Sequence, residues 1–338
     1  MTKKVLGLAV VAVLGLAAGA AQADTLADVK ARGFVQCGVT EGTPGFSVPD
    51  ANNEWAGLDV DYCRAVASAI FNDPKAVRFT PTTSENRWQT LSSGEVDLLS
   101  RTSTWTMTRD TTLGIKFVGT TYYDGQGFMV RKELGVKSAL ELSGATLCIE
   151  SGTTTELNAA DYFAANNMEY NPVTFVSQAE AYKAYEDGRC DAFTTDRSAL
   201  AGNRLELANP DDHVVLPEVI SKEPLAVVVR QGDDLWFNIT RWTYYALLEA
   251  EELGVSSANV DEMLGSDNPG VKRLLGVEGD FGTPMGLTKD WAYQIIKGTG
   301  NYSEIFERNV GSGSPIGLSR SVNALWKDGG LQYSPPIR

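Results

Sequence analysis

The sequence has almost no histidine and lacks the common catalytic motifs. Its single histidine, His213, lies in the polar stretch 209–213, where we expect a solvated loop residue. A Ser-His-Asp or Cys-His site would have to use this one residue. The motif G-x-S-x-G, a phosphate loop ending in G-K-[ST] and spaced metal-ligand clusters are also missing. The inventory favours a binding protein without metal or cofactor over an enzyme.

Positive charge is also scarce, with 29 Lys and Arg against 43 Asp and Glu and a formal charge of −14. Generic nucleic-acid binding needs a basic face that displaces counterions from phosphate, so this class is excluded. Binding to an anionic membrane surface is disfavoured for the same reason. Hydrophobic residues make up 43% and charged residues 21%, which excludes wholesale disorder. The length of 338 residues suggests about two domains.

Long apolar runs are absent except at residues 5–21. Lys3 and Lys4 precede this run, and small residues at positions 21 and 23 follow it. The pattern predicts a cleaved signal peptide over residues 1–23. The alternative is an uncleaved anchor, because the run approaches the ~20 residues that span a membrane. Cleavage would remove both lysines and leave an exported, periplasmic chain of charge −16 over residues 24–338.

Cysteine is sparse, and its spacing does not fit a metal site. No pair has C-x-x-C spacing, so neither a zinc site nor a thioredoxin-type site is expected. An even count in an exported protein favours two disulfides, with three possible pairings. Four buried free thiols are the alternative. The four residues are Cys37, Cys63, Cys148 and Cys190.

Strand-like and helix-like segments alternate along the chain. A long helix over 233–253 carries aromatic residues at helical spacing, which we interpret as core packing. Thr153 and Ser177 are each followed three residues later by Glu, which predicts two capping boxes. Repeated strand–helix units predict an α/β fold with mainly parallel sheets and helices on both faces. The expected strands include 34–39, 77–79, 96–100, 127–131, 145–150, 191–195, 214–216 and 226–229; shorter helices are expected at 59–71 and 87–93.

The candidate binding residues follow predicted strands, where open α/β sheets bind their ligands. Arg109 stands in a Thr-rich loop with Thr102 and Thr104, and an Arg fork pairs well with a carboxylate. Gly152 and Thr153 begin a helix whose free N–H groups suit an anion. Asp196 ends another strand and could hold an ammonium group. Together these residues predict a site for a ligand with both charges.

The order of motifs resembles the exported amino-acid-binding proteins of ABC transporters, and most closely their general L-amino-acid branch. The segment W-A-G-L-D-V-D at 55–61 matches the family's pattern at the start of its first helix, with Leu58 in place of Phe. Seven further segments carry the resemblance, at 37–39, 44–46, 94–97, 104–109, 122–123, 152–154 and 188–192 with Asp196. Segments at 101–106, 123–128, 216–224 and 331–338 resemble the general branch. The resemblance covers essentially the whole exported chain.

The resemblance implies a two-lobed periplasmic-binding-protein fold of type II that closes on its ligand through two hinge crossovers. Lobe 1 would comprise residues 24–129 and 228–338, and lobe 2 residues 130–227. The crossovers would lie near 128–131 and 226–230. The implied partners are an L-amino acid and an ABC permease of the inner membrane, with the protein itself a monomer. The pairs Cys37–Cys63 and Cys148–Cys190 would then each lie within one lobe.

The same resemblance implies roles for individual residues. Arg109, helped by Thr102 and Thr104, would bind the ligand's α-carboxylate, and Thr153 would add donors from the other lobe. Asp196 would bind the α-ammonium group.

Other positions would shape the ligand's side-chain pocket. Phe46 would form an apolar wall. Arg87 matches a position that contacts side-chain carboxylates, which points to Glu, Gln, Asp and Asn as ligands; a surface helix arginine is the alternative. Arg101 replaces a commoner small residue and would make a polar contact or pair with a buried acid. Leu58 would leave the side-chain pocket roomier.

The sequence leaves three matters open. The stretch 255–338 is longer than small members of the family need, and it would either pack on lobe 1 or contact the permease. An enzyme on the same fold, such as a cyclohexadienyl dehydratase, would need a general acid, for which Glu85 or Glu150 would serve. A protein that presents ligand to a sensor instead of a permease is the third class.

Overall fold

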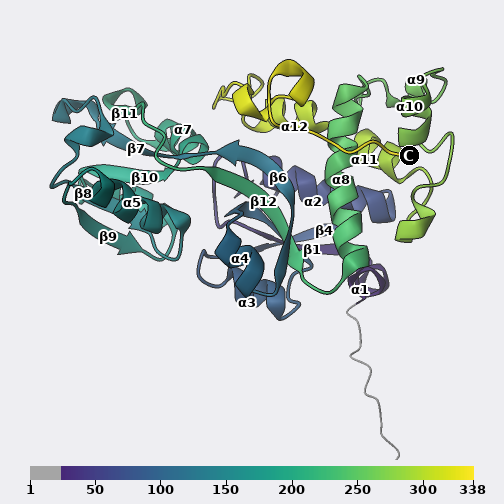
Figure 1. Cartoon of the computed structure of the whole chain (residues 1–338), viewed down its shortest axis with the longest axis horizontal. Helices are drawn as coiled ribbons and strands as arrows, with labels where there is room; N and C mark the ends of the chain where they lie inside the picture. Colours follow the sequence, from purple (N-terminus) through teal and green to yellow (C-terminus); the bar gives the residue numbers. More distant parts are fainter. Residues whose placement is uncertain (1–23) are drawn as a thin grey trace, which may run out of the picture.

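The computed structural model describes residues 24–338, and the predicted signal peptide at 1–23 lies outside them. Two five-stranded sheets form the cores of two lobes, which lie side by side in Figure 1. The first sheet has the order β4-β1-β5-β12-β6 and the second the order β11-β7-β10-β8-β9. The first sheet consists of β1 (Val35–Val39), β4 (Val77–Pro81), β5 (Leu98–Thr104), β6 (Ile115–Asp124) and β12 (Glu223–Arg230). The second consists of β7 (Gln126–Arg131), β8 (Thr146–Glu150), β9 (Asn171–Phe175), β10 (Ala192–Asp196) and β11 (His213–Val215).

The fold class is the expected one, a two-lobed α/β protein, and each sheet mixes strand directions. In lobe 1, β1 runs parallel to β4 and β5, whereas β12 runs antiparallel to β5 and β6. In lobe 2, β8 runs parallel to β9 and β10, whereas β7 runs antiparallel to β10 and β11. In each sheet, the strand that runs antiparallel to its neighbours is one that lies at a lobe crossover, β12 in lobe 1 and β7 in lobe 2.

The lobe crossovers lie a few residues before the expected positions. Strand β6 ends at Asp124 in the first sheet, and β7 begins at Gln126 in the second. The return crossover reaches the first sheet at Glu223, where β12 begins. Residues 126–129 therefore belong to the second sheet and 223–227 to the first, which differs from the expected boundaries at 129/130 and 227/228. Strands β7 and β12 are both largely buried, so their apolar sequences do not show at which residue the chain passes from one sheet to the other.

Helices flank both sheets. The long helix α8 (Asp234–Glu252) packs its stripe against lobe 1, with Trp236, Ile239 and Leu248 buried as expected. Lobe 1 also carries α1 (Thr25–Arg32), α2 (Leu58–Phe71), α3 (Arg87–Ser92), α4 (Met107–Thr112) and the short pair β2 (Val48–Pro49) and β3 (Trp55–Ala56). Lobe 2 carries α5 (Thr154–Ala165), α6 (Gln178–Glu186) and α7 (Arg197–Glu206).

The predicted capping boxes at α5 and α6 form only in part. The Thr153 hydroxyl accepts from the Glu156 N–H at 3.3 Å, and Ser177 does the same for Glu180 at 3.2 Å. The Glu156 carboxylate, however, accepts from the Gly152 N–H instead of the cap residue. A complete box forms at Asn301 and Glu304, which begin α12.

The stretch after α8 packs on lobe 1, which answers one open question. It contains α9 (Val260–Met263), α10 (Pro269–Leu274), α11 (Trp291–Thr299) and α12 (Tyr302–Asn309), and Figure 1 shows it in green to yellow beside α8 and α2. Arg308 and Asn309 donate to the buried Asp61 carboxylate at 2.8 and 2.6 Å. The Asn323 side chain binds both the N–H and the carbonyl of Tyr123, one residue before the crossover. Short 3₁₀ turns complete the described chain at Lys132–Leu134, Ala139–Glu141, Pro210–Asp212, Thr283–Met285, Ser321–Asn323 and Trp326–Asp328.

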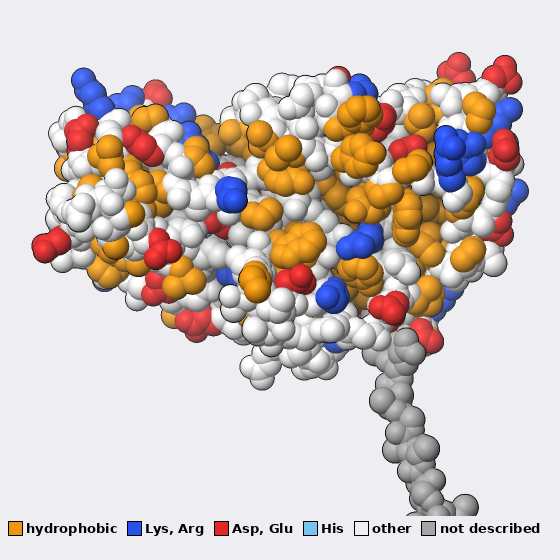
Figure 2. Space-filling view, viewed as in Figure 1, with side chains coloured by type: hydrophobic (Ala, Val, Ile, Leu, Met, Phe, Trp, Pro, Cys, Tyr) orange, Lys and Arg blue, Asp and Glu red, His pale blue; other side chains and the backbone are white. Residues whose placement is uncertain are grey.

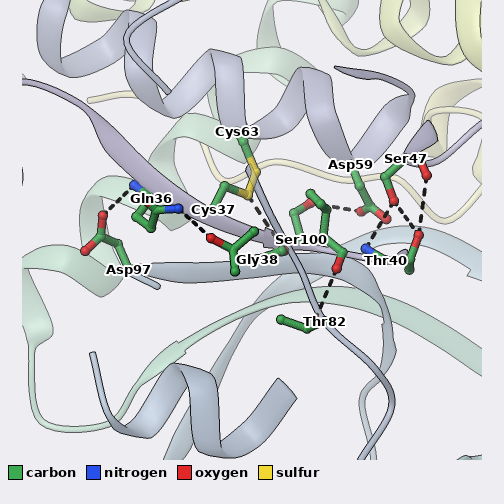
Figure 3. Close-up of a disulfide and its surroundings, with 12 residues drawn as sticks. Gln36, Cys37, Gly38, Thr40, Ser47, Asp59, Cys63, Thr82, Asp97 and Ser100 are labelled. Carbon is green, nitrogen blue, oxygen red and sulfur yellow. Dashed lines mark hydrogen bonds between the residues drawn. A yellow bond between two sulfur atoms is a disulfide. The ribbon is translucent and has the colours of Figure 1, made fainter. Parts of the chain in front are cut away.

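Both disulfides pair as the resemblance implied. Cys37 on β1 is joined to Cys63 on α2 (Figure 3), with Cα atoms 6.3 Å apart. Cys148 on β8 is joined to Cys190 just before β10, with Cα atoms 5.6 Å apart. Each bridge stays within one lobe, so neither restrains the hinge.

His213 differs from the expectation of a solvated loop residue. It begins β11, and its Nδ1 lies 2.6 Å from the Tyr185 hydroxyl. The half-buried ring therefore has a structural partner inside lobe 2.

Within residues 24–338, no helix combines the length and apolarity that a membrane span requires. The face in Figure 2 carries charges of both signs with apolar side chains gathered between them.

Candidate ligand-binding site

A polar cleft lies between the lobes and contains most of the predicted binding residues. Lobe 1 lines it from the loops and strand ends near β1, β4 and β5, and lobe 2 from the starts of α5 and α6 and the end of β10. Seven predicted residues lie on this lining: Arg87, Arg101, Thr102, Thr104, Arg109, Thr153 and Asp196. The lining has few apolar side chains, so the cleft suits a small charged or polar molecule.

Two predicted site residues, Phe46 and Gly152, do not line the cleft. Phe46 is 1% exposed and packs edge-on against Tyr122 in the core of lobe 1, with ring centres 5.3 Å apart. Leu58, whose size was expected to widen the pocket, is buried in the same core. Gly152 lies beside the cleft without lining it. The aromatic motif position was thus a poor guide, because a buried ring can support a lobe as easily as a pocket.

Arg109 lies in the first turn of α4 and is held there by residues that precede this helix. Thr106 is the N-cap of α4, and its hydroxyl accepts a hydrogen bond from the Arg109 N–H at 3.2 Å. Arg109 Nη1 donates to the Thr104 carbonyl at 2.9 Å. The guanidinium carbon lies 5.5 Å from the centre of the Trp88 ring. Burial lowers the pKa of Arg109 to about 10, so the group keeps its charge at neutral pH. The remaining N–H groups of the fork are available to an anion.

Arg87 and Arg101 place two buried cations on the cleft lining. They are 3% and 4% exposed, and neither forms an ion pair within residues 24–338. Both approach the Ser84 hydroxyl, at 3.5 and 3.4 Å. Nε and Nη2 of Arg87 and Nε of Arg101 have no hydrogen-bond partner there. An unpaired buried charge is costly, so an anion that entered the cleft beside these groups would be stabilised.

Asp196 faces these cations from lobe 2. It ends β10, as its position after a strand predicted. Burial, followed by the nearby carboxylates Asp124 and Glu223, raises the pKa of Asp196 well above its usual value. A ligand ammonium group beside it would favour the ionised carboxylate. Asp196 and Arg109 thus offer opposite charges on opposite lobes.

The end of strand β5, which carries Thr102, is held in an unusual conformation by a buried acid. Thr102 has a φ of 45°, and its N–H donates to the Asp59 carboxylate at 3.1 Å. The Ser100 hydroxyl donates to the same carboxylate at 2.9 Å (Figure 3). Burial raises the pKa of Asp59 to about 6. Asp59, from the family motif at the start of α2, therefore orients the strand end that enters the cleft.

The lobes touch each other around the cleft. The Ser151 hydroxyl of lobe 2 donates to Glu85 of lobe 1 at 2.8 Å. Gly152 has a φ of 70°, and a Cβ there would lie 3.3 Å from the Glu85 side chain. On the other side, a Cβ on Gly202 of α7 would lie 2.7 Å from Pro44 of lobe 1. Both glycines permit close approach of the two lobes.

Sequence reasoning missed part of the lining. Glu41, Ser84 and Gln178 lie on it, and Gln178 Nε2 is a buried donor without a partner within residues 24–338. Glu150, considered only as a general acid, also lines the cleft. Glu41 and Ser84 come from loops, Gln178 from the start of α6 and Glu150 from the end of β8, and no periodicity marks these positions. Residues 24–338 contain no cluster of His, Cys, Asp and Glu able to hold a metal ion.

Comparison with known proteins identifies the family. Residues 35–253 match the bacterial extracellular solute-binding proteins, family 3. The chain is 61% identical over the full length of both proteins to the "General L-amino acid-binding periplasmic protein AapJ" of Rhizobium johnstonii. It is 54% identical, over 97% of each protein, to the "Glutamate/glutamine/aspartate/asparagine-binding protein BztA" of Rhodobacter capsulatus.

A solved structure agrees with both. A periplasmic binding protein from Brucella ovis, described as having glutathione bound, superposes with a TM-score of 0.92 at 62% identity. The match covers 94% of this chain and 100% of that one. All three relatives are named as binding proteins, in agreement with the expectation that the chain is not an enzyme. The chain belongs to the bacterial extracellular solute-binding proteins of family 3.

Proposed function

We propose that this protein captures L-amino acids between its lobes in the periplasm and delivers them to an ABC permease. The preferred ligands are Glu, Gln, Asp and Asn. The family match and the names of the two curated relatives support the amino-acid class and the ABC partner. The site adds residue roles that those names do not contain.

The carrying observation is the pair of buried, unpaired guanidinium groups of Arg87 and Arg101 beside the Arg109–Asp196 pair. In this proposal Arg109 binds the α-carboxylate, with Thr102 and Thr153 as further donors, and Asp196 binds the α-ammonium group. Arg87 and Arg101 then remain for an acceptor at the end of the ligand's side chain. Because Arg109 and Asp196 lie on different lobes, a ligand that binds both favours the closed state over the open one.

A ligand panel tests the proposal. The chain from residue 24 is unfolded and refolded to remove carried-over ligand, and its melting temperature is measured with twenty L-amino acids, several D-forms and a few sugars. A ligand that binds only the folded state raises this temperature. We expect shifts with many L-amino acids, largest for Glu, Gln, Asp and Asn. Absence of a shift with every amino acid would remove the proposal.

Delivery is tested with membranes. Vesicles that contain an amino-acid ABC permease with its ATPase should take up radiolabelled glutamate only when the protein is added. Uptake that is independent of the protein, together with normal ligand binding, would favour a sensor as its partner.

Glutathione is a second candidate ligand, favoured by the glutathione bound to the Brucella ovis protein and by the polar lining. Its γ-glutamyl end carries the same α-carboxylate and α-ammonium groups as glutamate, and its glycine end carries a second carboxylate for Arg87 and Arg101. The same panel includes reduced glutathione and γ-glutamylcysteine. A larger shift with glutathione than with glutamate would make a γ-glutamyl peptide the preferred ligand.

A further inference from the structure

The cleft lining contains acids as well as cations. Arg87 and Arg101 come from lobe 1, and Glu150 lies on the same lining from lobe 2. Burial, followed by repulsion from Arg101 and Arg109, lowers the pKa of Arg87, and the Glu150 carboxylate acts in the opposite direction. Burial likewise lowers the pKa of Arg101, and Glu150 is the largest opposing influence. Glu150 therefore acts electrostatically on both cations across the cleft.

The position of Glu150 is fixed by its backbone, while its carboxylate stays uncommitted. It is the last residue of β8 and pairs with Phe175 of β9. Its carbonyl accepts from the Thr153 hydroxyl at 2.8 Å. Within residues 24–338, its half-buried carboxylate has neither a hydrogen bond nor an ion pair. A charge on the rigid end of a strand, without a protein partner, is available to a ligand.

We propose that Glu150 sets the preference of this site between carboxylate and carboxamide side chains. The inference rests on the proposed function, in which the ligand's side chain reaches Arg87 and Arg101. A glutamate side chain gains from both cations, and it is repelled by Glu150. A glutamine side chain offers its oxygen to an arginine and its NH₂ group to Glu150, so it gains a hydrogen bond where glutamate loses energy. The acid and the amide are thereby brought closer in affinity.

Two cations without an opposing acid would select strongly for an anionic side chain. A site with one carboxylate among them has a smaller net charge and both donors and acceptors. Specificity is a difference between two affinities, and a repulsive group changes it as effectively as an attractive one. Glu150 thus supplies a repulsive element that broadens the ligand range instead of narrowing it.

The test compares dissociation constants of L-glutamate and L-glutamine by titration calorimetry. Glu150→Gln keeps the shape and removes the charge. We expect the affinity ratio to move toward glutamate by about tenfold, the scale of one charge interaction at a partly exposed site. Glu141→Gln is the matched control, because Glu141 is an exposed acid of lobe 2 outside the cleft lining and its variant changes the net charge equally. Its ratio should equal that of the unmodified protein.

Other outcomes separate the two proposals. If the unmodified protein binds neither amino acid, the proposed function fails. If it binds both and Glu150→Gln leaves the ratio within twofold, or weakens both ligands equally, the role of Glu150 is refuted. Glu150→Asp retains the charge and should keep a ratio close to that of the unmodified protein. Thermal unfolding of each variant verifies that it is folded, and Glu150→Ala replaces Glu150→Gln if the latter is not.

Discussion

The carboxylate of Glu223 accepts a 2.6 Å hydrogen bond from the side-chain amide of Asn158. Glu223 begins β12 at the crossover, and Asn158 belongs to α5 of lobe 2. The same carboxylate accepts from the Thr104 hydroxyl of lobe 1 at 2.5 Å and from the Thr154 hydroxyl of lobe 2 at 2.9 Å. One buried acid at the hinge therefore joins both lobes through Thr104 and Thr154, two residues of the cleft lining.

The first prediction concerns the α-carboxylate contact. Arg109→Ala should weaken binding of every amino acid, because the ligand carboxylate loses its partner in a desolvated cleft. Loss of one member of such a charge pair costs on the order of 2–5 kcal/mol. Calorimetry with glutamate and glutamine measures the change. Arg109→Lys keeps the charge without the two-pronged guanidinium, so its affinity should lie between those of the unmodified protein and Arg109→Ala. Unchanged affinity in Arg109→Ala would refute the assigned role.

Replacement of Arg87 should stabilise the protein without ligand and weaken its binding of glutamate. Arg87→Met removes a buried, unpaired charge and retains an apolar chain over Trp88, whose ring centre lies 4.4 Å from the guanidinium carbon. We expect a higher melting temperature without ligand and at least about tenfold weaker glutamate binding. Arg78→Met is the control, since Arg78 is exposed, lies outside the cleft lining and is stacked on Phe34. A lower melting temperature with normal glutamate affinity would place Arg87 in the structure only.

Closure of the lobes can be opposed without touching the ligand. Gly202→Ala adds a methyl group against Pro44 of the other lobe, where a Cβ would lie only 2.7 Å away. Alanine is the better helix former by about 1 kcal/mol, so α7 and the melting temperature should not suffer. Affinity for all amino acids should fall, and small-angle X-ray scattering with saturating ligand should show a larger radius. Normal affinity in this variant would mean that the lobes do not approach as closely in the bound state.

Asp59 should make stability depend on pH in a defined direction. Its folded pKa of about 6 lies above the ordinary value of 3.8, so the protonated folded state is favoured. This contribution is full below pH ~4 and is lost as the pH rises through about 6. The stability of the protein relative to Asp59→Asn should therefore fall by on the order of 2–3 kcal/mol between pH 4 and pH 7.5. Urea unfolding of both proteins measures the difference, and a constant difference over that range would contradict the prediction.

The sequence allowed prediction of the parts of the fold that depend on local patterns. The strand at 34–39, the helix beginning near Asp59 and the helix at 233–253 were all located to within a few residues. The crossovers were misplaced, because β7 and β12 are equally apolar whichever sheet they enter. The disulfides followed from the family resemblance, since four cysteines alone permit three pairings.

The site was predicted where charged residues follow strands and missed where geometry alone assembles it. Arg109 and Asp196 lie on the cleft because strand ends meet there. Phe46 was misassigned, since an aromatic residue beside a motif packs equally well into a core. Gln178 was missed because it belongs to the first turn of α6, which only the tertiary fold brings to the cleft.

The pairing of Asp124 with Glu223 in the first sheet has a consequence for the architecture of the chain. Everything between these neighbours, residues 125–222, leaves lobe 1 and returns to the same place. Lobe 2 is thus one continuous segment whose two ends lie side by side, and it contains its own disulfide, Cys148–Cys190. Exchange of this segment between relatives would combine the lobe 2 side of one binding site with the lobe 1 side of another and leave the sheet of lobe 1 intact.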